Sequence, residues 1–282
     1  MATVKIVTDS SVQLSEDEKS KYDITVIPLS IMIDETVYVD GETISSEQFV
    51  KMMLEADNLP KTSQPPIGKF VDAFDKLGAD GSQVLCINMM EQLSGSVHAA
   101  EQAATLSSAD VTVVDSGTTD RGLGFQVVEA AKLAATGASV DEIVERIETV
   151  RKNTVMAMGV MTLDNIVKGG RLHPVAGAIT NFLNIKIILK IEDHKLKIES
   201  KGRGVKFIKK YFDNVISSMS QDKAIKAIGI SYVNTTDLIS EIADKIKEQV
   251  QNVPFLLKVT SPVISTHAGE GAFALFYFDD PE

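Results

Sequence analysis

Two serines flank a glycine where an apolar run gives way to an Ala-rich run near the middle of the chain. Residues 84–89 are short and mainly apolar, which indicates a buried strand rather than a helix. Residues 97–106 are mostly strong helix formers, so Ser94, Gly95 and Ser96 stand at a predicted helix start. The first N–H groups of a helix have no partner within it, and the helix dipole favours negative charge there. The pattern therefore predicts a site for a small anion.

A second hydroxyl cluster precedes the first along the chain. Thr62 and Ser63 stand just before Pro65 and Pro66, which restrict the conformation of the predicted loop that leads into another helical pattern. Serine is also a common N-cap residue, so either cluster alone is compatible with helix capping and no ligand. Two clusters with the same chemistry favour an anion site.

Composition limits the partners that such a site could have. The chain has 282 residues, which predicts one large or two ordinary domains. The net charge of -11 argues against nucleic acid or an anionic membrane surface as a partner, because both require a concentrated positive field. We expect a diffusely acidic surface that favours solubility.

The single cysteine and the apolar patterning point to the cytoplasm. Cys86 excludes an internal disulfide, and its place in an apolar run predicts an inert core residue rather than a nucleophile. Residues 1–11 lack the charged and apolar regions of a signal peptide. No apolar run approaches the roughly 18 residues of a membrane span. We therefore expect a cytoplasmic protein without integral membrane association.

Strand and helix patterns alternate through the first half of the chain. Capping-box spacings begin at Ser15, Ser45 and Ser139, which predicts helix starts there. Strand patterns cover residues 4–9 and 111–115 as well as the run at 84–89. Alternation of this kind predicts a mostly parallel, doubly wound α/β sheet, which we assign to a first domain at residues 1–152. In such sheets ligands collect at the carboxyl ends of the strands.

The second half has a different pattern. Strand-like segments at residues 155–161, 227–232 and 255–259 are interspersed with helical stretches. The pattern of residues 185–200 predicts a hairpin that turns at Asp193 and His194. Hairpins mixed with helices predict an α+β second domain, which we assign to residues 153–282.

Three further residues have the chemistry to reach an anion. Arg171 and Arg203 stand beside glycines, where the backbone can approach a ligand closely and a guanidinium can pair with an oxyanion. An ordinary surface arginine beside a turn is the alternative for each. His267 follows a strand-like segment and precedes Ala-Gly-Glu-Gly, and it either donates to an anion or is a satisfied core group.

Several catalytic motifs are missing. The histidines show no metal-ligand spacing, and the chain contains no Walker A motif and no complete dinucleotide fingerprint. We therefore expect no metal, no cofactor and no catalytic residue. The alternative from another class is a hydrolase or acyltransferase with Ser94 as nucleophile and His98 or His267 as base, although Ser94 lacks the glycines of the nucleophile elbow. A binder of another small anion is a third reading.

Five short motifs stand in the order seen in DegV-type proteins, and the whole chain resembles that family. The motifs are DSS at 9–11, TSQP at 62–65, LSGS at 93–96, GGR at 169–171 and HAGEG at 267–271. The resemblance implies a cytosolic bacterial protein that binds a long-chain fatty acid between its two domains. It also implies similarity to the binding subunit of fatty acid kinase, which presents the acyl carboxylate to a separate kinase subunit for phosphorylation.

The same resemblance implies roles for individual residues. It assigns the carboxylate contacts to Thr62 or Ser63, Ser94, Gly95 and Ser96, with His267 near the headgroup. It places Arg171 and Arg203 on a surface that faces the kinase.

The chain departs from the family pattern at three positions. Pro66 stands where serine is common, Ser96 replaces a usual threonine, and Glu270 replaces a usual proline. We expect the carboxylate of Glu270 to face away from the site, because it would repel the fatty acid carboxylate.

Overall fold

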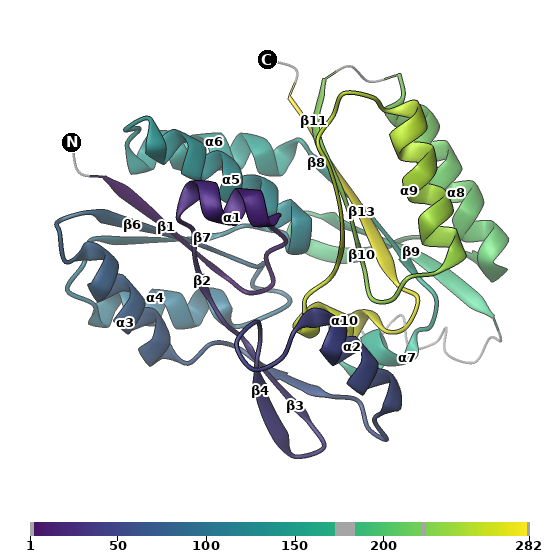
Figure 1. The fold of residues 1–282 in the computed structure, drawn as a ribbon, viewed down its shortest axis with the longest axis horizontal. Helices are drawn as coiled ribbons and strands as arrows, with labels where there is room; N and C mark the ends of the chain where they lie inside the picture. The colour runs from purple at the N-terminus through teal and green to yellow at the C-terminus, as the bar shows by residue number, and fades with distance from the viewer. Residues whose placement is uncertain (1–2, 173–183, 222–223, 281–282) are drawn as a thin grey trace.

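The structure, a computed structural model, describes residues 3–172, 184–221 and 224–280 (Figure 1). Within these ranges the chain forms three β-sheets with helices packed against them. No helix in the described ranges is long and apolar enough to cross a membrane.

The first sheet is parallel and belongs to the N-terminal half. Its strands are β1 (Val4–Asp9), β2 (Thr25–Ile27), β6 (Gln83–Asn88) and β7 (Val111–Asp115), in the order β2-β1-β6-β7. The helices of this half are α1 (Glu16–Tyr22), α3 (Ile67–Gly78), α4 (Ser96–Leu106), α5 (Asp120–Ala135) and α6 (Val140–Lys152). Buried parallel strands need apolar cover on both faces, and here α3 and α4 cover one face while α5 covers the other (Figure 1). The predicted doubly wound sheet is confirmed.

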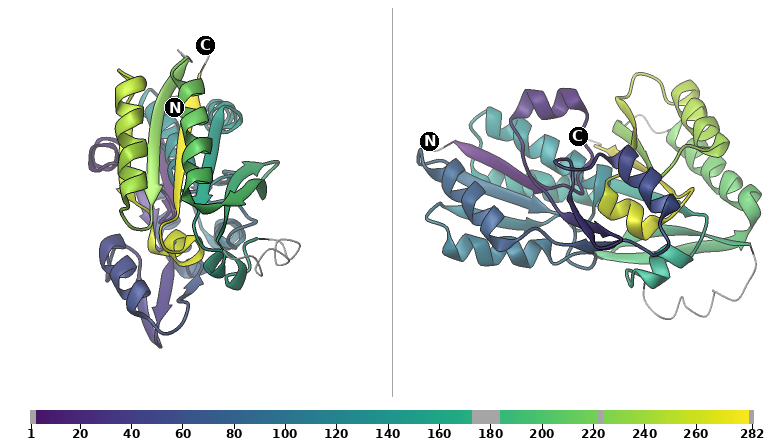
Figure 2. Two further views of the ribbon diagram at one scale, coloured as in Figure 1. Left: turned by 90° about the vertical axis from the view of Figure 1, so that its right-hand side faces the viewer. Right: turned by 60° about the horizontal axis from the view of Figure 1, so that its bottom comes forward.

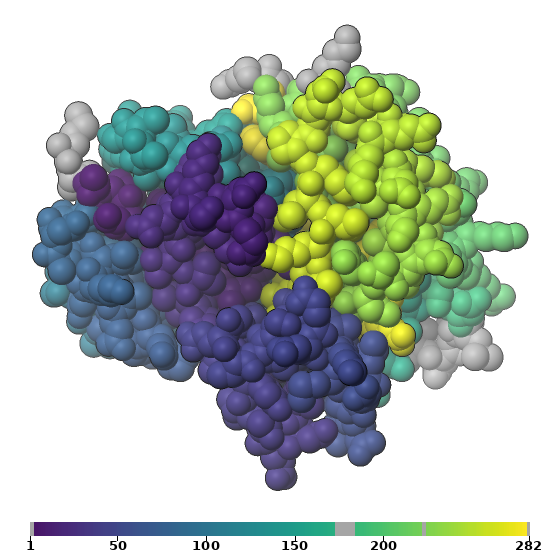
Figure 3. All heavy atoms as spheres, in the orientation of Figure 1, coloured from purple at the N-terminus to yellow at the C-terminus, as the bar shows by residue number. Residues whose placement is uncertain are grey.

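A small antiparallel sheet projects from the first half. It contains β3 (Ser30–Ile33), β4 (Thr36–Val39) and β5 (Lys61–Ser63) in the order β4-β3-β5, and α2 (Ser46–Glu55) lies between β4 and β5 in the chain. The β3–β4 hairpin forms the lower projection in Figures 1 and 3. The sequence predicts a loop at Thr62 and Ser63, but these residues form a short strand because β3 offers them hydrogen-bond partners.

The second sheet has six strands in mixed directions. They are β8 (Thr154–Val160), β9 (Ile185–Glu192), β10 (Lys195–Arg203), β11 (Ile225–Tyr232), β12 (Phe255–Val259) and β13 (Phe273–Asp279), in the order β10-β9-β8-β13-β11-β12. Only β11 and β12 pair in parallel among these described strands. The helices α8 (Gly204–Met219) and α9 (Asp237–Gln249) cover one face (Figure 2). The predicted α+β arrangement and the hairpin turn at Asp193 and His194 are confirmed.

Two short helices complete the fold where the sheets meet. They are α7 (Asp164–Lys168) and α10 (Pro262–Ala268), which pack against each other. The sequence predicts a strand-like segment before His267, and that prediction is wrong, because Ser261 caps a helix whose first residue is Pro262. The β-branched residues of this segment are packed between the two halves of the molecule, and that packing outweighs their strand preference.

The open face of the second sheet packs against α5. One continuous apolar cluster contains Leu85 of β6, Leu123 of α5 and Met158 of β8, so the core runs through both halves. The space-filling view shows the N-terminal and C-terminal segments in contact along their boundary (Figure 3). The chain passes from one sheet to the other between α6 and β8, and the division into domains at residues 152 and 153 stays a prediction.

Candidate functional site

A cleft of about 880 Å³ lies where β5, the segment after α7 and the end of α10 converge. Its lining includes Thr62 from β5, Gly169 and Arg171 from the segment after α7, and His267 from α10. These residues are far apart in the sequence, and the packing of α10 on both α7 and β5 brings them together. The cleft therefore unites three of the motifs that the sequence singled out.

The two adjacent hydroxyls of β5 have different surroundings. Thr62 Oγ1 lies 3.0 Å from Nε2 of His267, and the Thr62 side chain is half-buried. Successive side chains of a strand point to opposite faces, so Ser63 points away from Thr62, and it is exposed. Of the two hydroxyls that the sequence left as alternatives, the structure places Thr62 in the cleft.

His267 is held by close packing against glycine. A Cβ atom at Gly169 would lie 2.2 Å from Nδ1 of the His267 ring, so only glycine leaves room for the imidazole. That Nδ1 is buried and has no hydrogen-bond partner among the described residues. Burial, and secondly the charge of Arg171, lower the pKa of His267 to about 4. The imidazole is therefore neutral at pH 7.

The serine turn forms the start of α4. The Oγ atoms of Ser94 and Ser96 lie 2.9 Å apart, and the N–H of Ser96 donates to Ser94 Oγ at 3.3 Å. Ser96 is buried, whereas Ser94 is half-buried. Gly95 is the N-cap residue, as the predicted strand, turn and helix require.

The two hydroxyl segments lie against each other through Gln64. A Cβ atom at Gly95 would lie 2.0 Å from Oε1 of Gln64, which follows Thr62 and Ser63 in the chain. The end of the Gln64 side chain therefore occupies the space beside Gly95. The structure brings the two hydroxyl clusters into one region.

The guanidinium of Arg171 lies over the same region. Its Nη1 donates to the carbonyl of Gly169 at 2.7 Å, and its Nε donates to the carbonyl of Leu93 at 3.2 Å. Partial burial lowers the pKa of Arg171, and the group keeps its positive charge at neutral pH. The cleft thus contains a fixed cation beside the neutral imidazole.

Arg203 lies elsewhere. It is the exposed N-cap residue of α8, at the end of β10, and it lines none of the cleft described above. Arg171, in contrast, lines the cleft. Their role towards a kinase stays a prediction.

The geometry does not assemble the alternative catalytic pair. His98 is exposed and its ring nitrogens pair with Glu91 and Glu101 at 3.0 and 3.1 Å. His267 pairs with Thr62, and within the described parts of the chain no hydrogen bond joins either histidine to Ser94. A nucleophile needs a base within hydrogen-bond reach, so the contacts of Ser94 favour binding over catalysis. Cys86 is buried, and burial raises the pKa of its thiol, as expected for a core residue.

An apolar pocket of about 70 Å³ extends behind the cleft. Its lining comprises Met89, Leu93, Thr119, Met156, Met158, Ile166, Arg171, Ile191, Leu196, Val263, Ile264, His267 and Ala268. Arg171 and His267 line both the cleft and this pocket, so polar groups stand at the entrance to an apolar interior.

A deeper pocket of about 40 Å³ continues in the same direction. The two apolar pockets share Thr119, Met156, Met158, Ile264 and Ala268. The deeper one ends at Asp120, Ser231 and Thr260 beside aromatic residues of β13. Sequence reasoning missed these lining residues, and the alternation of Met156 and Met158 on β8 was the one local sign that they share a face.

Comparison with known proteins agrees with this arrangement. The sequence profile of the DegV family, described as uncharacterised, matches residues 3–280. The chain belongs to the DegV family. A DegV domain-containing protein of Streptococcus pneumoniae serotype 4 is 46% identical over 275 residues, which cover 98% of each chain.

Solved DegV structures share the fold over nearly the whole chain. The DegV protein of Bacillus subtilis, described as a fatty acid binding protein, has a TM-score of 0.89 at 25% identity and covers 99% of this chain and 100% of its own. A fatty acid binding DegV family protein of Streptococcus agalactiae gives the same TM-score, identity and coverage.

Glu270 is one of the three positions at which the sequence departs from the DegV family pattern. Glu270 is exposed and lines neither the cleft nor the apolar pockets. Glu270 therefore lies outside the linings of the DegV cleft and of both apolar pockets. Within the described residues of this DegV protein, no three His, Cys, Asp or Glu side chains gather where they could hold a metal ion.

Proposed function

We propose that this protein binds a long-chain fatty acid, with the carboxylate in the cleft and the hydrocarbon chain in the apolar pockets behind it. The observation that carries the proposal is the junction of a polar cleft with an apolar interior at Arg171 and His267. The fatty acid binding described for the Bacillus subtilis and Streptococcus agalactiae relatives supports it.

The cleft and the neighbouring start of α4 offer what an ionised carboxylate needs. A fatty carboxylate is charged at pH 7, so it requires donors once it leaves water. Arg171, which lines the cleft, supplies positive charge and contacts the carbonyl of Leu93. The next residue, Ser94, would supply a hydroxyl, and the first N–H groups of α4 would supply a helix N-terminus. Gly95 and Ser96 take part as the residues that begin this helix.

The hydrogen bond between Thr62 and His267 decides whether the Thr62 hydroxyl can donate to the fatty acid carboxylate. A neutral imidazole carries one N–H, and the partner of His267 Nε2 is Thr62 Oγ1. With the proton on Nε2, the imidazole donates to Thr62 Oγ1, and the Thr62 hydroxyl hydrogen is left to donate to the fatty acid carboxylate. In this assignment His267 acts through Thr62 and stays uncharged.

The hydrocarbon chain would supply most of the affinity. Burying about 14 methylenes at roughly 0.8 kcal/mol each gives a gross gain near 11 kcal/mol, from which the costs of association and ordering are subtracted. The two apolar pockets, about 70 and 40 Å³, are smaller than common ligand pockets of roughly 300 to 1,000 Å³. Binding therefore requires side chains to move, and Met156 and Met158 are flexible enough to do so.

We further infer that the protein presents the bound acid to a separate kinase in the cytoplasm and catalyses no step itself. The carboxylate would lie in a cleft that opens to the surface, where a partner can reach it. Arg203, exposed at the start of α8, is the residue that we assign to the kinase-facing surface, and Arg171 would face the kinase across the cleft.

Native mass spectrometry of the protein purified from a bacterial host, followed by organic extraction, tests the ligand. The expected result is a bound C14 to C18 acid. Ser94→Ala should weaken binding of palmitic acid about tenfold, since a charge-assisted hydrogen bond contributes roughly 1.5–3 kcal/mol. Ser63→Ala is the matched control, because its hydroxyl is exposed and points away from Thr62. A protein that carries no lipid and takes up none of these acids would contradict the proposal.

Arg203→Ala tests the partner surface. Fatty acid binding should stay within about twofold of the parent, because Arg203 lines neither the cleft nor the two apolar pockets described above, while phosphorylation of the bound acid by the kinase subunit should fall. Lys76→Ala, an exposed cation on α3, is the control and should change neither quantity. Loss of fatty acid binding in Arg203→Ala would place the headgroup site at Arg203 instead.

A further inference from the structure

Thr119 presents an unusual hydroxyl in the apolar interior. It is the N-cap residue of α5, the residue is 7% exposed, and its Oγ1 is buried without a hydrogen-bond partner among the described residues. A threonine at an N-cap normally accepts a bond from an N–H of the first helical turn. Here Asp120 has a left-handed φ of 56°, and its own carboxylate accepts the N–H of Arg121. Thr119 is thus left without the capping bond.

Thr119 stands at the junction of the two apolar pockets. Thr119 lines both of them, opposite Met156 and Met158 of β8. Leaving a hydroxyl buried and unpaired costs free energy, and valine would fill the same volume without that cost. A polar atom of a bound ligand that forms a hydrogen bond with the Thr119 hydroxyl would remove this free-energy cost.

We propose that Thr119 is a polar subsite within the hydrocarbon pocket, which binds a hydroxyl or oxo oxygen on the chain of an oxygenated fatty acid. The proposal deepens the fatty acid binding proposed above and rests on it. A hydroxyl both donates and accepts, so Thr119 can pair with an alcohol or with a ketone. A double bond is the weaker alternative, because O–H contacts to π electrons are second-order.

The arrangement of the pockets places the oxygen in the middle of the chain. One pocket joins Thr119 to Arg171 and His267 at the headgroup end, and the other joins it to Asp120 at the far end. At that far end the hydroxyls of Ser231 and Thr260 already donate to the Asp120 carboxylate. The polar groups of the far end are thus paired with one another, whereas the Thr119 hydroxyl has no partner among the described residues.

Binding measurements on matched ligands test the subsite. The probes are 10-hydroxyoctadecanoic acid, octadecanoic acid and 10-methyloctadecanoic acid, the last of which carries a branch at the same carbon without oxygen. We expect the parent protein to bind the hydroxy acid about tenfold more tightly than the methyl-branched acid. Thr119→Val should lose about tenfold for the hydroxy acid and less than twofold for octadecanoic acid. Thr119→Ser keeps the hydroxyl and should retain the preference.

Three results would overturn the proposal and one would bear on the function itself. Equal affinity of the parent for the hydroxy acid and the methyl-branched acid shows that Thr119 lines the pocket without forming a hydrogen bond to the ligand. If Thr119→Val still prefers the hydroxy acid over the methyl-branched acid, another residue binds the oxygen. If Thr119→Val weakens the binding of oleic acid but not that of the hydroxy acid, the Thr119 hydroxyl contacts a double bond instead of an oxygen. A parent that binds octadecanoic acid poorly contradicts fatty acid binding instead. If Thr119→Val fails to fold, Thr119→Ala replaces it under the same criteria.

Discussion

His267 is a neutral group between two features that both oppose its protonation. The ring is largely buried against Gly169, and the guanidinium of Arg171 lies close enough to repel a second positive charge. Protonation would add a hydrogen to Nδ1, which is buried without a hydrogen-bond partner among the described residues. The bond from Nε2 to Thr62 Oγ1 would be kept in either charge state.

Stability should depend on pH through His267. The pKa of His267 is lowered from 6.5 in the unfolded chain to about 4, so the unfolded state binds a proton that the folded state does not. The stabilisation is complete above pH 6.5 and is lost as the pH falls towards 4. Between pH 7 and 5 the parent should lose about 2 kcal/mol more unfolding free energy than His267→Gln, measured by urea denaturation.

The difference in the pH dependence of unfolding free energy between the parent and His267→Gln reports the contribution of His267 alone. Burial raises the pKa of Asp40 to about 7 and that of Asp120 to about 6, and both act in the opposite sense, since their contributions to stability grow as the pH falls. Both carboxyls are present in both proteins, so their contributions cancel. Superimposable pH profiles of the parent and His267→Gln would contradict a depressed pKa at this site.

At the scale of elements, β8 and β13 divide their side chains between two environments. In the register of this antiparallel pair Ala274 lies opposite Met158, and both face α5 and the apolar pockets. Leu275 lies opposite Ala157, and both face α8 and α9 instead. The period of two along each strand therefore decides which side chains limit the pocket.

Ala274→Leu should shorten the acyl pocket from its deep end. The larger side chain fills space beside Met158, so binding of octadecanoic acid should fall about tenfold while binding of dodecanoic acid changes little. Ala157→Leu is the matched control, because the same substitution on the opposite face overpacks the core by a similar cost of about 1–3 kcal/mol. Equal losses for both chain lengths in Ala274→Leu would show that the deep pocket is not used.

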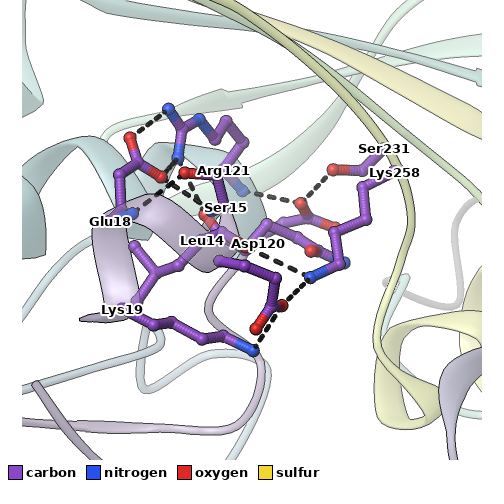
Figure 4. A network of polar contacts seen from close by, with 10 residues as sticks. Leu14, Ser15, Glu18, Lys19, Asp120, Arg121, Ser231 and Lys258 are labelled. Carbon is purple, nitrogen blue, oxygen red and sulfur yellow. Dashed lines mark hydrogen bonds and ion pairs between the residues drawn. The ribbon is translucent and has the colours of Figure 1, made fainter. Parts of the chain in front are cut away.

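At the scale of the whole molecule, a buried polar network joins the two halves (Figure 4). Asp120 accepts from the hydroxyls of Ser231 and Thr260 in the C-terminal half, and the next residue, Arg121, pairs with Glu18 at 2.7 Å. Lys258 donates to the carbonyl of Leu14 at 3.2 Å (Figure 4). The start of α5 therefore anchors both sheets and holds the deep pocket between them.

Asp120→Ala should weaken this junction. Two buried hydroxyls would lose their acceptor, and alanine would have to adopt the left-handed φ of 56°. We expect a loss of about 2–4 kcal/mol in unfolding free energy. Asp120→Asn should cost less than about 1 kcal/mol, because asparagine tolerates this conformation and keeps an acceptor oxygen. Chemical denaturation distinguishes them, and equal losses for both variants would show that the hydroxyl contacts contribute nothing.

Local features were readable from the sequence because their causes lie within a few residues. The caps at Ser15, Ser45 and Ser139 form as predicted, since each involves a side chain and a backbone group three residues away. The serine turn at Gly95 was predictable for the same reason. The mixture of parallel strands and hairpins followed from the order of these local patterns.

The tertiary structure alone decided which of these residues meet. Thr62 rather than Ser63 faces His267 because β5 pairs with β3 in one register, and a shift by one residue would exchange the two faces. His267 reaches Thr62 from 205 positions away only because a short helix packs between the sheets. Thr119 lines the apolar interior because the second sheet packs against α5. Such contacts depend on long-range packing, which no local period or spacing in the sequence encodes.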